Sequence, residues 1–89
     1  MSLSNTFHAL SEPNRQKILD LLKEKELPVA EIGLGLNITM PTLSHHLDIL
    51  KRADLISGRR EGQQIFYSLN LSVLEELTEK IVKFLSPKK

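Results

Sequence analysis

The chain has 89 residues, of which 40% are hydrophobic and 26% are charged, and its formal net charge is only +1. These values are ordinary for a small globular protein and exclude a disordered or collagen-like chain. No apolar run approaches the roughly 20 residues that a membrane-spanning helix needs, and the N-terminus lacks the apolar core of a signal peptide. The absence of cysteine excludes disulfides, thiol redox sensing and thiolate metal sites. We therefore expect one domain over residues 1–89 that stays where it is made.

Two short helices are expected at the N-terminal end of the chain. The first covers residues 4–10, with Leu3, Phe7 and Leu10 on one side. Ser11 is predicted to cap the second helix, and Glu12 and Pro13 suit its first turn. The second helix runs to about residue 25, and its spacing predicts that three apolar residues are buried: Ile18, Leu19 and Leu22.

A third helix is expected over residues 28–36, and it contains two glycines. Gly33 and Gly35 each cost up to about 1 kcal/mol relative to alanine inside a helix. Leu34, between them, is expected to point toward solvent. A locally frayed helix is the favoured interpretation; the alternative is a close approach of the backbone to a neighbouring element or a ligand.

A fourth helix is expected to begin after Thr39, its predicted N-cap, and to end near Arg52. Because so short a link joins it to the third helix, the two form a helix-turn-helix. Its buried face is predicted from apolar spacing at i, i+4 and i+7: Leu43, Leu47 and Leu50. Small and hydrogen-bonding side chains gather near its start, which is typical of a helix that reads base edges in the major groove of DNA.

The apolar period changes after Asp54 and predicts a β-hairpin. Ile65, Tyr67 and Leu69 alternate, and Gly62 supplies the positive φ of a tight turn. From residue 39 to residue 63, four Lys and Arg stand against three acidic residues, which leaves a local charge of +1. Any DNA binding must therefore depend on where the charges lie and not on their total.

The final helix is expected to open on a capping box, Ser72 to Glu75. Its apolar residues cover close to half of its circumference, which is more than a terminal helix needs to lie on a small core. The first helix is too short to cover this stripe, so a homodimer formed by the two ends of the chain is the economical explanation. The residues predicted for the dimer interface are Leu3, Phe7, Leu10, Leu74, Leu77, Ile81, Phe84 and Leu85.

Four segments together carry a resemblance to a known family: SEPNR (11–15), KILDLL (17–22), TLSHHLDIL (42–50) and REGQQIFYSL (60–69). From about residue 7 to residue 85 the chain resembles the ArsR/SmtB winged-helix repressors of bacteria. The resemblance implies a mostly α-helical winged helix-turn-helix with a small β-hairpin wing. It also implies a cytoplasmic homodimer, paired through its first and last helices, that represses transcription by binding double-stranded operator DNA.

The resemblance also assigns DNA-contacting positions in this chain. Ser44 and His45 match the family's main base-contacting pair, and Thr42 matches a neighbouring contact. Arg59 and Arg60 match the wing's phosphate or minor-groove positions, whereas Gln63 departs from the basic residue that many relatives carry there. His46, at the edge of the apolar face, is expected to have a partly buried hydrogen-bonding role that includes a phosphate contact. The full predicted set is Thr42, Ser44, His45, His46, Lys51, Arg52, Arg59, Arg60 and Gln63.

The metal-sensing ligands of many relatives are missing. Pro28 and Ala30 stand where the family's cysteines would be. Neutral side chains also replace the second ligand set of the family, at Leu71, Val73, Phe84 and Pro87. No metal or cofactor is therefore expected, and the chain resembles a branch that responds to another signal or represses without an inducer.

The sequence can also be compared with what three other functions would require. Catalysis lacks support, because the sequence contains no nucleophile–base pair, phosphate-binding glycine loop or carboxylate dyad. A winged-helix module that binds another protein would use the exposed Leu34 and Ile49. An inducer-binding regulator would place a pocket near Gly33 and Gly35 or between the end helices, and this is compatible with DNA binding.

Overall fold

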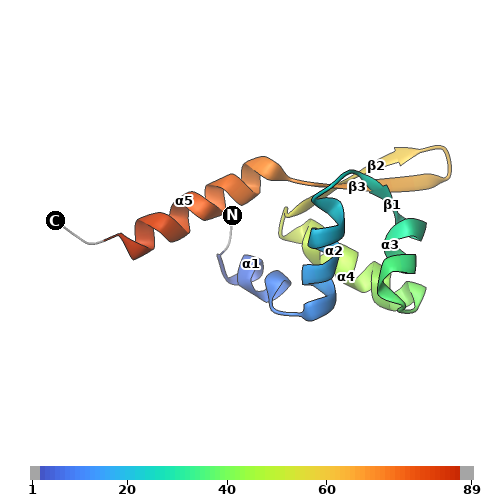
Figure 1. Cartoon of the computed structure of the whole chain (residues 1–89), viewed down its shortest axis with the longest axis horizontal. Helices are drawn as coiled ribbons and strands as arrows, with labels where there is room; N and C mark the ends of the chain where they lie inside the picture. Colours follow the sequence, from blue (N-terminus) through green and yellow to red (C-terminus); the bar gives the residue numbers. More distant parts are fainter. Residues whose placement is uncertain (1–2, 87–89) are drawn as a thin grey trace.

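The computed structural model describes residues 3–86 and confirms the predicted fold class, a mostly helical winged helix-turn-helix (Figure 1). Pro87 lies outside the described residues. The antiparallel sheet has the strand order β1-β3-β2, and β2 and β3 form the wing. The elements are α1 (Leu3–Leu10), α2 (Pro13–Leu22), β1 (Leu27–Pro28), α3 (Val29–Leu36), α4 (Met40–Arg52), β2 (Ile56–Glu61), β3 (Gln64–Leu69) and α5 (Leu71–Leu85).

The sheet contains β1 in addition to the predicted hairpin. The sequence prediction, in which a helix begins at Pro28, is therefore wrong at this residue. Leu27 pairs with Tyr67 and Pro28 pairs with Phe66. Proline has no N–H to donate to a ladder, so it is tolerated only where a strand lies at the edge of a sheet, as β1 does. The pairing attaches the start of α3 to the base of the wing.

Two of the predicted helix caps are wrong, and the cap of α4 is confirmed. Glu12, not Ser11, caps α2: its Oε2 accepts hydrogen bonds from the N–H groups of Asn14 and Arg15 at 2.9 and 3.2 Å. Ser72 does not cap α5, because the helix already begins at Leu71. The preceding Asn70 gives α5 no side-chain cap, and its amide donates to the carbonyl of Asp54 instead.

The largest completely buried side chains of the core come from α2, α3 and α4 and from Leu55 and Ile56, where β2 begins, and Ala9, Leu27 and Tyr67 pack with them. Ile18, Ile32, Leu43 and Leu50 are all completely buried, as is Leu55. Leu47 is also buried, which confirms the apolar face predicted for α4. Each such side chain contributes about 1.5–3 kcal/mol relative to an exposed one. The core therefore holds α4 in a fixed position.

The two glycines of α3 allow close helix packing. A Cβ on Gly35 would lie 3.0 Å from Cδ1 of Leu21 in α2, and one on Gly33 would lie 3.3 Å from Cδ2 of Leu43 in α4. The helix continues through both positions to Leu36. Of the two interpretations of this segment, the close approach to a neighbouring element is therefore correct and the frayed helix is wrong.

The helix α5 extends away from the core as an arm, opposite to the wing (Figure 1). The molecule measures 53 × 23 × 20 Å along its principal axes. Leu77, near the middle of α5, is buried, whereas Phe84, near its end, is 87% exposed. The C-terminal part of α5 thus presents large apolar side chains to solvent. Within the described residues, no helix is long and apolar enough to cross a membrane.

Candidate nucleic-acid interface

The start of α4 exposes the predicted base-reading side chains. Thr39 caps the helix by accepting from the N–H of Thr42, and the hydroxyl of Thr39 also donates to that of Thr42 at 2.9 Å. Ser44 and His45 are exposed, while Leu43 beside them is completely buried. A rigid helix therefore displays short polar side chains on one face, as major-groove readout requires.

A hollow of about 280 Å³ lies between α4 and the wing. Its α4 side includes Ser44, Asp48 and Lys51, and its wing side includes Ile65 and Tyr67 of β3. One face of the wing therefore borders the face of α4 that displays Ser44.

The two wing arginines lie on opposite faces of β2, because successive side chains of a strand alternate. Arg60 pairs with Ile65, which lines the hollow beside Ser44. Directly opposed residues share a face, so Arg60 lies on the side of the wing that borders α4. Arg59 pairs with Phe66 and lies on the reverse side. The two arginines, equivalent in the sequence prediction, are thus in different positions relative to α4.

Arg59 is held by two carboxylates and an aromatic ring. Its Nε and Nη2 donate to the two carboxylate oxygens of Glu26, and its Nη1 donates to Glu61. The guanidinium carbon lies 5.1 Å from the centroid of the Phe66 ring. Hydrogen bonding to Glu26, and then to Glu61, raises the pKa of Arg59 above its ordinary value, and the same contact with Arg59 lowers the pKa of Glu26.

The remaining predicted phosphate contacts are exposed. Arg52 forms an ion pair with Asp48 one helical turn earlier, with Nε 3.1 Å from Oδ2. Lys51 and Arg60 are exposed and form no ion pair within residues 3–86. Gln63 follows Gly62 in the wing turn, where Gly62 has a φ of +63° as predicted. The wing tip thus carries a neutral side chain beside the exposed Arg60.

His46 lies inside the protein, which contradicts its predicted phosphate contact but agrees with its predicted burial. Its side chain is buried, and its Nδ1 lies 3.1 Å from Nη1 of Arg15. Because arginine can only donate, Nδ1 must accept, and the ring proton of the neutral form lies on Nε2. Nε2 is 3.6 Å from a carboxylate oxygen of Glu12. The predicted hydrogen-bonding role of His46 is therefore internal to the protein.

Arg15 joins α1, α2 and α4 through this buried cluster. Its Nε donates to the carbonyl of Ala9 at 2.8 Å, and its Nη2 donates to the carbonyl of His8 at 3.1 Å. Because Nη1 donates to Nδ1 of His46, all three nitrogens of the Arg15 guanidinium form hydrogen bonds. Arg15 therefore links α4 to the C-terminal end of α1.

His46 is expected to make the stability of the protein sensitive to acid. Burial, followed by the charges of Arg15 and His45, lowers the pKa of His46 below its ordinary value of 6.5, against the opposing effect of Glu12. As the pH falls below 6.5, the unfolded chain binds this proton before the folded protein does, so unfolding becomes more favourable. His46→Gln, which retains an acceptor for Arg15, should remove this component.

The measurement is thermal unfolding at about pH 8 and about pH 5.5, on either side of the ordinary histidine pKa. On acidification the wild type should lose more thermal stability than His46→Gln does. His8→Gln, at an exposed histidine, is the control and should follow the wild type. Equal acid losses in the wild type and His46→Gln would contradict this role.

The residues predicted for dimerisation fall into two groups. Leu77 is buried within the single chain, and Leu10 and Leu74 are half-buried. The others line a groove of about 320 Å³ between α1 and α5, where Lys80 is the one charged residue among the described residues: Leu3, Phe7, Ile81, Phe84 and Leu85. Contiguous exposed apolar surface of this kind marks an interaction site.

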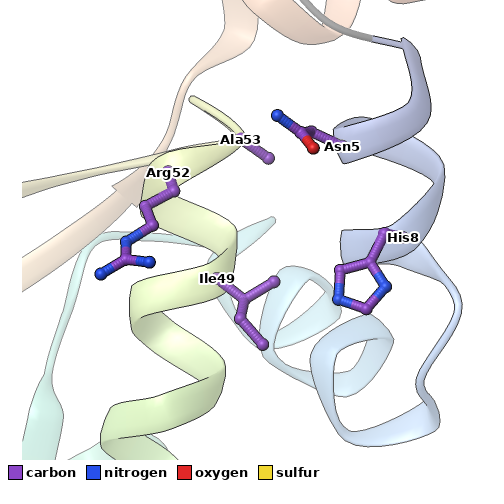
Figure 2. A pocket seen from close by; sticks show the side chains of 5 residues that line it. All are labelled: Asn5, His8, Ile49, Arg52 and Ala53. Carbon is purple, nitrogen blue, oxygen red and sulfur yellow. The ribbon is translucent and has the colours of Figure 1, made fainter.

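The alternative docking patch of Leu34 and Ile49 is not present as predicted. Leu34 is 85% exposed, as expected, but Ile49 is half-buried and packs against the core. Figure 2 shows Ile49 lining a cavity between α1 and α4, together with Asn5, His8, Arg52 and Ala53. The guanidinium of Arg52 points away from His8 in this view. Of the two residues predicted for a protein-binding patch, only Leu34 is therefore available to a partner.

Sequence reasoning missed the partners of Arg59 and His46. Glu26 lies 33 residues from Arg59, and Arg15 lies 31 residues from His46. No local pattern links residues at such separations. The packing of β1 against β3, which was also missed, is what places Glu26 next to the wing.

Comparisons with known proteins agree with this geometry. A protein-family model described as a helix-turn-helix domain matches residues 10–59. The transcriptional repressor SdpR of Bacillus subtilis is 45% identical over 84 residues, covering 94% of this chain and 93% of that protein. The arsenical resistance operon repressor of Staphylococcus aureus is 33% identical over 79 residues, covering 89% of this chain and 76% of the relative.

A solved structure shares the fold. The homodimeric winged helix-turn-helix DNA-binding domain Mb0332 of Mycobacterium bovis superposes with a TM-score of 0.73, at 23% identity, covering 98% of this chain and 87% of that one. The chain belongs to the ArsR/SmtB family of winged helix-turn-helix transcriptional regulators, which are DNA-binding proteins and not enzymes.

Proposed function

We propose that the protein is a homodimeric repressor that binds a palindromic operator in bacterial DNA, with one α4 from each protomer in successive major grooves. The exposure of Ser44 and His45 on a helix whose other face is completely buried carries this proposal. Half-sites should lie about 34–36 Å apart along one face of the duplex, because that distance is one turn of B-form DNA.

The exposed residues divide into base readers and phosphate binders. Ser44, His45 and Thr42 are short enough to hydrogen-bond base edges without filling the groove. The cations bind the backbone, which sets affinity and register but carries no sequence information: Lys51, Arg52 and Arg60. Arg60 is the more effective wing residue, because it borders α4 and has no carboxylate partner within the described residues.

The groove between α1 and α5 supports the dimer. Among residues 3–86 its lining is apolar apart from Lys80, and the lining residues belong to α1 and α5. The Mycobacterium bovis domain of the same fold is homodimeric. A two-fold axis through this groove would make a self-complementary contact between two copies of α5.

Ser44→Ala and Arg60→Ala are expected to weaken DNA binding in different ways. Loss of a base-edge hydrogen bond should cost about 1–3 kcal/mol on the operator and little on random DNA. Loss of a phosphate contact should weaken binding to both DNAs alike and lower the salt slope by about 1. Gel-shift titrations over a range of salt concentrations, against the DNA upstream of the coding sequence and a scrambled duplex, measure both effects.

Lys17→Ala is the control for Arg60→Ala, because Lys17 is an exposed cation on α2 and belongs to neither α4 nor the wing. It should leave the salt slope unchanged. The assignment of base readers and phosphate binders would be wrong if Ser44→Ala weakened binding to the two duplexes equally, or if Arg60→Ala retained the wild-type salt slope. Failure of the wild type to bind either duplex at any salt concentration would overturn the proposed function itself.

A further inference from the structure

We propose that Glu26 is a counter-ion that DNA can displace. In the free protein it binds the guanidinium of Arg59, and it thereby lowers the affinity of the wing for DNA. This inference rests on the proposed function and adds a residue that sets DNA affinity from outside the DNA-facing surface. Glu26 precedes β1, and the pairing of β1 with β3 brings it beside the wing.

The geometry leaves Arg59 little capacity for a phosphate. Glu26 accepts from Nε and Nη2, which is the bidentate arrangement that a phosphate would also use. Glu61 accepts from Nη1, and Phe66 covers one face of the guanidinium. These contacts engage three of the five N–H groups of Arg59, so a DNA phosphate can take the bidentate position on Nε and Nη2 only by displacing Glu26.

The net charge of Glu26, Arg59 and Glu61 also disfavours a phosphate at this position. One guanidinium and two carboxylates sum to −1, so this part of the wing repels a phosphate backbone although it contains an arginine. The three side chains are substantially exposed, at 51% for Arg59, 36% for Glu26 and 64% for Glu61. Exposed ion pairs add little net stability and are screened by salt, so the contact is one that DNA can replace.

Glu26 is a better candidate for this role than Glu61. Glu61 lies in β2 next to the wing turn, so its charge acts on nearby DNA whether or not it holds Arg59. Glu26 reaches Arg59 from another part of the chain and engages two of its nitrogens. Neutralising Glu26 therefore changes Arg59 more selectively.

Glu26→Gln is expected to strengthen binding to operator and random DNA alike, by about ten-fold at about 0.1 M salt, and to steepen the salt dependence by about one phosphate. Glu24→Gln is the matched control, since Glu24 is an exposed glutamate that forms no ion pair within the described part of the chain. Glu24→Gln removes the same charge as Glu26→Gln. It should change DNA affinity less than two-fold, because salt screens the charge of Glu24 at the DNA.

The decisive variant combines Glu26→Gln with Arg59→Ala. If Glu26 acts by occupying Arg59, the gain from Glu26→Gln should vanish in the Arg59→Ala background. A gain equal to that of Glu24→Gln, a gain that persists without Arg59, or weaker binding by Glu26→Gln would each overturn the proposal. These outcomes all presuppose that the wild type binds DNA, so they are distinct from failure of the proposed function.

Discussion

Replacing Ile81 with glutamate is expected to turn dimers into monomers and to lower operator affinity by about a hundred-fold or more, because two linked recognition helices bind far more tightly than one. Ile81 is 38% exposed in the single chain, so the new carboxylate can stay solvated in a monomer. In a dimer made through the α1–α5 groove, two such charges would be buried and unpaired, which is strongly unfavourable.

Lys83→Gln is the matched control for Ile81→Glu. Both substitutions lower the net charge by one, but Lys83 follows Ile81 by two residues and lies on the opposite side of α5. Sedimentation velocity measures the oligomeric state, and gel shifts measure operator affinity. The proposed interface would be refuted if Ile81→Glu sedimented as a dimer, or if it became monomeric without losing operator affinity.

Arg15→Ala is expected to lower the free energy of unfolding by about 3 kcal/mol, since it leaves buried hydrogen-bonding groups without a charged donor. The carbonyls of His8 and Ala9 and the Nδ1 of His46 would all lose their partner. For a domain of this size, such a loss corresponds to about 12–24 °C in Tm. Thermal unfolding at fixed protein concentration measures it.

Lys17→Ala, on the same helix, removes an equal charge from an exposed position and should lie within about 0.5 kcal/mol of the wild type. Arg15→Lys should be intermediate, because lysine keeps the charge but presents its donors from a single point. A Tm for Arg15→Ala close to that of Lys17→Ala would mean that the buried cluster does not hold α1 and α4 together.

The helical pattern made most of the fold predictable from the sequence. The apolar spacing of Leu43, Leu47 and Leu50 identified the buried face of α4, and Gly62 identified the wing turn. These features are local, so a few neighbouring residues determine them. The strand β1 was not predictable in the same way, because two residues form no pattern until Tyr67 and Phe66 pair with them.

The exposure of the candidate residues at the start of α4 was predictable, but their connections were not. Helical spacing predicted that Thr42 and His45 point away from the buried face and that Ser44 lies on its flank, and all three are exposed. The burial of His46 was also predictable from its place at the edge of the apolar face, but its predicted phosphate contact was wrong, because helical spacing does not reveal Arg15. The difference between Arg59 and Arg60 likewise depends on a carboxylate 33 residues away, and only the folded chain brings it near.

Two copies of α4 are expected to read DNA together through Ser44 and His45. The most direct test is selection of bound sequences from a pool of random duplexes, with the wild type and Ser44→Ala in parallel. The wild type should enrich an inverted repeat whose half-sites are centred about 10–10.5 base pairs apart, and Ser44→Ala should relax the preference at one position in each half-site. Enrichment of a single unpaired site, or of the same sequence with equal stringency by both proteins, would contradict the claim.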